Sequence, residues 1–317
     1  MGFFNWFKSA PAIDARLREY IDRAANCADP RIRQLPGYDR KLAAAVGTAF
    51  GYCERIALAV PGPFFINRTK FASDPLVHAL FGSVADIAVM LASSQPLRDY
   101  LAAHPATSDQ PIFALLGMRR SLNAGFGTRL AGDIIKRDEP QTTLNFSDHT
   151  LAEPTPDLDN LHLRLAETFY EGLLKGLTEE IETRRQELFE LREHLALDKA
   201  MHRARGDSEL TARFAGMQAR IAELGDSLMP AALISRLSDH LMSPAAHLRL
   251  EPTRFRIDRL GVIVEAGDQE TPADTIRCAE LVTRDQRHWV VMAVRFEHGE
   301  ALAALAEMRE RQRYMVI

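Results

Sequence analysis

Two stretches of the chain, RRQELFELREHL at residues 184–195 and MQARIAELGDSL at residues 217–228, decide the fold. Each stretch carries positions in steps of four, three and four residues, and we name these positions the seam. The seam consists of Arg184, Leu188, Leu191, Leu195, Met217, Ile221, Leu224 and Leu228. Its two halves are mirror images about Gly206, and only Arg184 is not apolar. This spacing is typical of two helices that pack side by side, so we predict an antiparallel coiled coil with its tip at Gly206.

The predicted hairpin extends beyond the seam, over residues 158–243. No proline interrupts the outgoing helix before Gly206. Pro230 lies in the returning helix, and we expect it to bend this helix rather than end it, because apolar residues continue at helical spacing behind it. Mirror symmetry sets the register of the two helices. The expected contacts are Leu191 with Ile221 and Leu188 with Leu224.

Hydrophobic periodicity changes on either side of the hairpin. Residues 1–105 are periodic at helical spacing and predict a helical domain. Residues 106–157 alternate with a period of two, and turn-forming residues at 123–127 favour a small antiparallel β meander, followed by a linker. Residues 244–317 alternate in the same way and then return to helical spacing over about residues 300–313, which predicts an antiparallel sheet with a closing helix.

These segments predict an α+β protein that is predominantly helical. The predicted domains are residues 1–105, 106–157, 158–243 and 244–317. Because β segments flank the hairpin on both sides, the hairpin could be an insertion between two parts of one sheet. Asp74 before Pro75 is a helix start signal, and residues 283–287 are expected to connect two strands as a hairpin.

The composition is that of an ordinary soluble protein, with 46% apolar and 26% charged residues among 317. A formal net charge of -4 gives the chain no general attraction for nucleic acid, so no nucleic-acid partner is expected. We find neither a secretory signal nor a clean apolar span of about 20 residues, which favours a cytoplasmic location. Cys27, Cys53 and Cys278 are interpreted as buried thiols in a reducing compartment.

The N-terminus is unusually aromatic, with Phe3, Phe4, Trp6 and Phe7 followed by Lys8. Aromatic rings next to a basic residue are typical of a segment that lies at the membrane–water interface. Docking onto the body of the protein or into a partner groove would bury the same rings. The sequence therefore predicts an interaction segment and leaves three partners open: the chain itself, another protein, or weakly the inner face of a membrane.

Motifs that bind cofactors or perform catalysis are missing from the sequence. We find no dinucleotide-binding loop, no P-loop, no nucleophile elbow and no His-Glu-x-x-His, so no cofactor and no metal site is predicted. The dipeptide Asp148-His149 has the most enzyme-like chemistry. In a regular strand these two side chains point to opposite faces, so they would not act on each other.

Asp86 is the third candidate for a polar site, because it lies in a helix that is otherwise apolar. A buried carboxylate must be paired or neutralised. Arg55 lies in another apolar helix, so we predict a buried ion pair between Arg55 and Asp86.

A long helical hairpin offers an extended surface and no pocket, which favours protein–protein contact. The leading hypothesis is a non-catalytic cytoplasmic adaptor or regulatory protein that binds another protein through its hairpin. The alternative is a regulator that senses a small molecule in its β domain. An enzyme that uses Asp86, Asp148 or His149 is the third hypothesis.

Overall fold

The computed structural model describes residues 13–105, 110–131, 134–202, 208–265, 267–268, 271–284 and 288–315. These residues form an α+β fold that is mostly helical, with an antiparallel sheet and a closing C-terminal helix, as the sequence predicts. The chain divides into two compact units. The first unit contains the chain up to residue 53 together with residues 168–247, and the second contains residues 54–167 and 248–317. The boundaries between the two units fall inside the predicted segments 1–105 and 158–243. The division into four domains stays a prediction.

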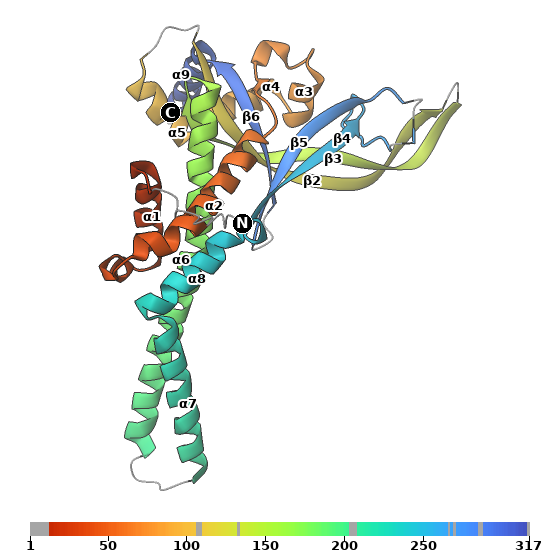
Figure 1. The fold of residues 1–317 in the computed structure, drawn as a ribbon. Helices are drawn as coiled ribbons and strands as arrows, with labels where there is room; N and C mark the ends of the chain where they lie inside the picture. The colour runs from red at the N-terminus through yellow and green to blue at the C-terminus, as the bar shows by residue number, and fades with distance from the viewer. Residues whose placement is uncertain are drawn as a thin grey trace, which may run out of the picture. The chain divides into compact units, whose positions relative to one another are not determined.

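Helices make up the first unit, and Figure 1 shows α7 running back beside α6. The helices that lie in it wholly or in part are α1 (Ala15–Ala28), η1 (Pro30–Gln34), α2 (Tyr38–Leu58), α6 (Leu158–His202), α7 (Ser208–Ser227), α8 (Pro230–Met242) and η3 (Pro244–Ala246). Three aromatic rings mark the centre of its core: Tyr20 stacks on Phe50 with ring centroids 4.1 Å apart, and Tyr170 meets both rings edge-on. The tyrosine hydroxyl of Tyr170 donates a hydrogen bond to the carbonyl oxygen of Tyr20.

The seam faces inward in the α6–α7 hairpin. Every seam position is buried or half-buried, and the residues between them are mostly exposed. The Arg220 guanidinium donates to Glu187 at 2.9 Å, and Arg213 lies 3.6 Å from Asp198. These two ion pairs join α6 to α7 in the antiparallel sense. The tip at Gly206 lies outside the described residues, and the individual seam contacts stay predictions.

The returning helix breaks at Pro230, which the sequence analysis did not predict. α7 ends at Ser227, Met229 is extended with ψ 142°, and Pro230 starts α8 as its first residue. Proline is well suited to a first helical turn, where its missing N–H has no partner to lose. The expected bend is therefore a complete break between two helices.

The second unit contains the sheet. Its strands are β1 (Phe64–Phe65), β2 (Pro111–Ala131), β3 (Ile134–Thr155), β4 (Leu248–Ile257), β5 (Asp274–Thr283) and β6 (His288–Glu297), in the order β3-β2-β6-β5-β4, with β1 paired to β6 in parallel. Its helices are η2 (Arg68–Lys70), α3 (Pro75–Leu80), α4 (Val84–Ser93), α5 (Gln95–Ala103) and α9 (His298–Met315). Antiparallel pairing of β2 with β6 joins the segments before and after the hairpin in one sheet. The predicted insertion is thereby confirmed.

The predicted antiparallel β structure before the hairpin is present, but it is one long ribbon of β2 and β3 rather than a small meander. β2 continues through residues 123–127 without a turn. Its partner β3 has irregular register at three places, and each contains an acidic residue with positive φ: Asp138 at 56°, Asp148 at 54° and Glu153 at 51°. Each extra residue in β3 is a β-bulge, and bulges increase the twist of a ribbon.

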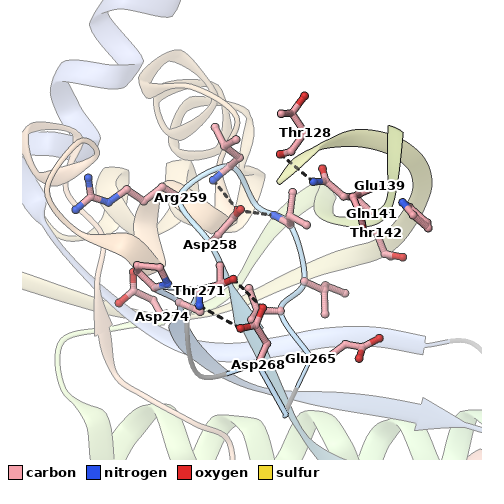
Figure 2. A pocket seen from close by; sticks show the side chains of 17 residues that line it. Thr128, Glu139, Gln141, Thr142, Asp258, Arg259, Glu265, Asp268, Thr271 and Asp274 are labelled. Carbon is pink, nitrogen blue, oxygen red and sulfur yellow. Dashed lines mark hydrogen bonds between the residues drawn. The ribbon is translucent and has the colours of Figure 1, made fainter. Parts of the chain in front are cut away.

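A second ribbon, β4–β5, packs against the first. Leu144, Ile257 and Ile276 form a buried cluster between them. Residues 258–265, which follow β4, fold back on β3, where the Ile263 N–H donates to the carbonyl oxygen of Thr142 at 2.8 Å. The carboxylate of Asp258 holds this loop by accepting hydrogen bonds from backbone N–H groups (Figure 2).

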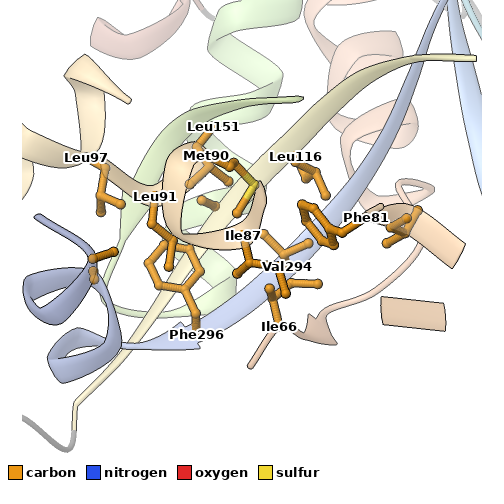
Figure 3. Close-up of a cluster of buried hydrophobic side chains, with 14 of the residues drawn as sticks. Ile66, Phe81, Ile87, Met90, Leu91, Leu97, Leu116, Leu151, Val294 and Phe296 are labelled. Carbon is orange, nitrogen blue, oxygen red and sulfur yellow. The ribbon is translucent and has the colours of Figure 1, made fainter. Parts of the chain in front are cut away.

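The main core of the second unit lies between one face of the sheet and the surrounding helices (Figure 3). Alternate residues of β6 point into it, and Met292, Val294 and Phe296 are all fully buried. α4 contributes Ile87 and Leu91 from the helix layer. On the other side of β6, the N–H of Ala293 donates to the carbonyl of Pro61, and Gly62 approaches Ala293 so closely that a Cβ would clash with its backbone. This close approach explains the glycine at position 62.

Candidate functional site

The structure brings the three predicted polar residues into one region of the second unit. The charges of Asp86 and Asp148 both act on the imidazole of His149. Nε2 of His149 is 2.8 Å from the carbonyl oxygen of Leu80, and its ring stacks on Phe81 with centroids 4.7 Å apart. Because a carbonyl only accepts, Nε2 donates this hydrogen bond. Burial lowers the pKa of His149, despite the opposing effects of the Leu80 carbonyl and the two carboxylates.

The side chains of Asp148 and His149 contact different sides of the sheet, even though β3 has a bulge at these residues. The Asp148 carboxylate lies 3.5 Å from Arg119, whose guanidinium stacks over Trp289. His149 instead packs with Phe81 in the helix-covered side. The expectation of opposite faces therefore agrees with the contacts, and the two residues form no hydrogen-bonded acid–base pair in the structure.

The predicted buried ion pair between Arg55 and Asp86 is wrong. Both side chains are exposed. Asp86 lies in the first turn of α4, where its carboxylate accepts a hydrogen bond from the Ser83 hydroxyl at 2.9 Å, and the same hydroxyl accepts from the Asp86 N–H. This reciprocal arrangement caps the helix. Asp86 thus supports the N-cap Ser83 and is exposed, whereas residues such as Ile87 and Leu91 form the buried side of α4.

Sequence reasoning missed a buried carboxylate in the sheet. Glu280 is 6% exposed, with Arg120 Nε 2.9 Å from one oxygen and His288 Nδ1 3.2 Å from the other. The sequence signal that could have revealed it is the alternation along β5, which places Glu280 on the same face of the strand as the apolar Ile276 and Cys278. Burial, with a contribution from Glu280, raises the pKa of the Cys278 thiol to about 11, so this thiol is protonated and unreactive at neutral pH.

An open cavity of about 1330 Å³ lies where the two ribbons end (Figure 2). Glu139 lines it from the first ribbon, and Asp258, Glu265 and Asp274 line it from the other side, with Arg259 as the basic residue among the described lining residues. The charged side chains of the cavity are therefore mostly acidic, and apolar side chains such as Leu260 and Val264 line it beside them. Such a surface attracts cationic groups by long-range electrostatics.

A second unpredicted charged group lies in the first unit, at the start of η1. The Asp29 side chain is 4% exposed and accepts hydrogen bonds from the side chains of Arg31 and Arg185, the latter at 2.8 Å. The hydrogen bond from Arg31 holds the pKa of Asp29 below its ordinary value, and the charge of Arg185 acts in the same direction. Arg185 belongs to α6, so Asp29 ties η1 to the side of the hairpin helix.

Several other predictions meet the structure only in part. Phe3, Phe4, Trp6 and Phe7 lie outside the described residues, so the aromatic segment stays a prediction. Cys27 is exposed, contrary to the expectation of three buried thiols, because it lies on the outer side of α1. Among the described residues, no group of three or more side chains could hold a metal ion, and no helix is both long and apolar enough to cross a bilayer.

Comparisons with protein-family models, with curated proteins and with solved structures found no match for this chain.

Proposed function

We propose that the α6–α7 hairpin is an antiparallel coiled coil whose outer surface binds another protein, and that the chain is a non-catalytic adaptor or regulatory protein. The observation that carries this proposal is the exposure of two large apolar side chains on the outside of α6. Phe189 is 57% exposed and Leu197 is 58% exposed, although the seam already provides the inward positions. The exposed Ala196 and Ala200 extend this apolar surface. Clustered apolar exposure is typical of protein-binding surfaces.

The chemistry of the polar region supports a non-catalytic role. Asp86 caps a helix, Asp148 pairs with Arg119, and His149 is bound to a backbone carbonyl. A nucleophile, its base and an orienting group joined by hydrogen bonds would instead favour an enzyme. The three residues are therefore interpreted as structural.

Native mass spectrometry of the full chain purified from its own host tests the proposal. The variant F189A/L197A should lose the bound partner, because both side chains lie on the proposed surface. Its stability should change by no more than about 0.5 kcal/mol, since exposed side chains contribute little to folding. The control V89A/L302A removes two apolar side chains of α4 and α9 that are each 45% exposed, and it should keep the partner. A partner retained by F189A/L197A would contradict the proposal.

Disulfide crosslinking tests the coiled coil itself. In a background with Cys27 replaced by serine, cysteines at positions 191 and 221 should form a bridge within one chain. Cysteines at 191 and 217 are the matched control and should bridge poorly, because the predicted register places them one turn apart. A bridge between two chains, or equal bridging in the control, would overturn the predicted intramolecular register.

A second candidate function is favoured by the cavity at the ribbon ends. Its volume of about 1330 Å³ and its carboxylates suit a small cationic ligand, and such a ligand would make the chain a sensor. A ligand that binds only the native state raises the melting temperature. Spermidine is a suitable probe, and the variant E139Q/E265Q should lose any shift that it produces. No shift with spermidine would remove the support for this candidate.

A further inference from the structure

Three basic residues follow one another along one side of α6 at a spacing of seven: Arg185, Arg192 and Lys199. In a coiled coil, residues seven apart lie on the same side of the seam. Arg185 is paired, because it binds the buried Asp29 and also Glu182. Arg192 and Lys199 are exposed and form no ion pair with any residue in the part of the chain that the structure describes. We name these three residues the basic stripe.

The other side of the seam is closed by an ion pair. Glu187 lies there, one position before Leu188, and its carboxylate accepts two hydrogen bonds from Arg220 of α7. Positions directly before one seam residue and directly after the next flank the seam on opposite sides. Arg192 directly follows Leu191, so the basic stripe lies on the side without this pair. The two sides of the hairpin thus differ in charge and in how they are closed.

The part of α7 that faces the open side carries small or short side chains. Ala215, Gln218, Ala222 and Gly225 occupy the positions that flank the seam there. None of them can neutralise the basic stripe. Small side chains also let a further helix approach closely, because the distance between packed helices depends on the side chains at their contact. Phe189, which is 57% exposed, lies beside the stripe on the α6 side.

The chain itself shows how a carboxylate binds this surface. Asp29 at the start of η1 is 4% exposed and lies 2.8 Å from Arg185, the first member of the stripe. From Arg185, each further member lies about 10 Å along the helix, at 1.5 Å per residue. The basic residue of this contact therefore recurs outward along α6, paired with a carboxylate at its first position and without an ion pair among the described residues at the next two.

We propose that the open side of the hairpin binds an acidic amphipathic helix of a partner protein, with carboxylates opposite Arg192 and Lys199 and an apolar side chain against Phe189. This inference rests on the proposed function, since it names the face and the chemistry by which the hairpin binds its partner. The partner helix carries acidic residues about seven positions apart, which matches the spacing of the stripe. Its apolar face lies against the alanines of α7.

Two labelled peptides test this on the full chain by fluorescence anisotropy. One is a designed 21-residue amphipathic helix with glutamate at every seventh position, and the other has lysine there. The glutamate peptide should bind the wild type and weaken at least about tenfold on R192E/K199E, because both pairs become repulsive. The lysine peptide should show the reverse preference. The control R40E/K41E carries the same charge change on α2 and should bind within about twofold of the wild type.

Two outcomes would overturn the inference: equal binding of the glutamate peptide to the wild type and to R192E/K199E, or tighter binding of the lysine peptide to the wild type. Native mass spectrometry separates this failure from failure of the proposed function. If R192E/K199E keeps the host partner while F189A/L197A loses it, the hairpin binds a partner but not through the stripe. If both variants keep the partner, the proposed function itself fails.

Discussion

The hairpin and the sheet bury their apolar residues to different extents. In the hairpin, Leu188, Leu191 and Leu195 remain half-buried, and full burial begins only at Leu224 and Leu228. In the sheet, alternate residues of β6 are fully buried. Two isolated helices cover each other on one side only, whereas a strand is covered by neighbouring strands at both edges and by a helix layer on one face. The same type of side chain should therefore stabilise the sheet more than the hairpin.

Their contacts also differ in sequence separation. The hairpin consists of α6 and α7, which are consecutive helices in the described chain, while the sheet pairs β2 with β6, on opposite sides of the whole hairpin in sequence. Short-range pairing costs less chain entropy than long-range pairing. The hairpin is thus the local element, and the sheet is the element that depends on the complete chain.

The largest expected effect comes from the sheet core. F296A should lower the free energy of unfolding by about 3–5 kcal/mol, because it leaves a cavity among fully buried side chains. Urea unfolding followed by circular dichroism measures this. V89A removes an exposed side chain of α4 and serves as the control, with a change within about 0.5 kcal/mol. A loss below about 1 kcal/mol for F296A would contradict the expectation that the sheet core contributes more to stability than the hairpin does.

Within the hairpin, the expected effect depends on position. L224A should cost about 2–3 kcal/mol, since Leu224 is 1% exposed, and L191A should cost about 1 kcal/mol because its site is half-buried. Thermal unfolding of both variants measures the difference. Equal losses would show that the outer seam is packed as tightly as the base of the hairpin.

Asp29 makes the stability of the first unit depend on pH. Its pKa lies below the ordinary value of 3.8, so the folded state prefers the ionised carboxylate. The resulting stability is present above pH 3.8 and is lost as the pH falls through the lower folded-state pKa. D29N should cost about 1–2 kcal/mol at neutral pH, through the weakened cap and the lost arginine pairs, and should flatten this acid dependence. Urea titrations between pH 2 and pH 7 would show it, and an unchanged slope would exclude the ion pairs.

His149 also makes the stability of the second unit depend on pH, with a smaller effect and in a higher pH range. Burial lowers its pKa below 6.5, so the folded state prefers the neutral imidazole. Its contribution to stability is present above pH 6.5 and is lost as the pH falls through the folded-state pKa. An NMR titration of the imidazole should give a midpoint below 6.5. A midpoint above 6.5 would mean that Asp86 and Asp148 outweigh burial.

The smallest effects are expected at Arg55 and Asp86. Because both side chains are exposed, R55A should change stability by no more than about 0.5 kcal/mol. D86A should cost about 0.5–1 kcal/mol through loss of its contact with Ser83. A double-mutant cycle should give additive losses. A coupling free energy between the two residues would show that they interact, contrary to the structure.

The sequence by itself determined the elements that depend on neighbouring residues. The long helices of the hairpin, the capping of α3 by Asp74 and the antiparallel pairing of β5 with β6 follow from spacing and from local hydrogen bonds, and the structure has all three. Such contacts join residues of one turn, one helix or two adjacent elements. Their pattern is therefore visible along the chain.

Only the tertiary structure decided which distant residues meet. Asp86 was expected in the core because its helix is apolar, but the side of a short helix that faces the core depends on what packs against it. The pairs of Arg120 with Glu280 and of Asp29 with Arg185 join residues more than 150 positions apart, so no spacing predicts them. The length of the β2–β3 ribbon depends likewise on bulges in β3 and on the second ribbon against it. Local periodicity specifies elements, whereas packing between elements selects the charged groups that become buried together.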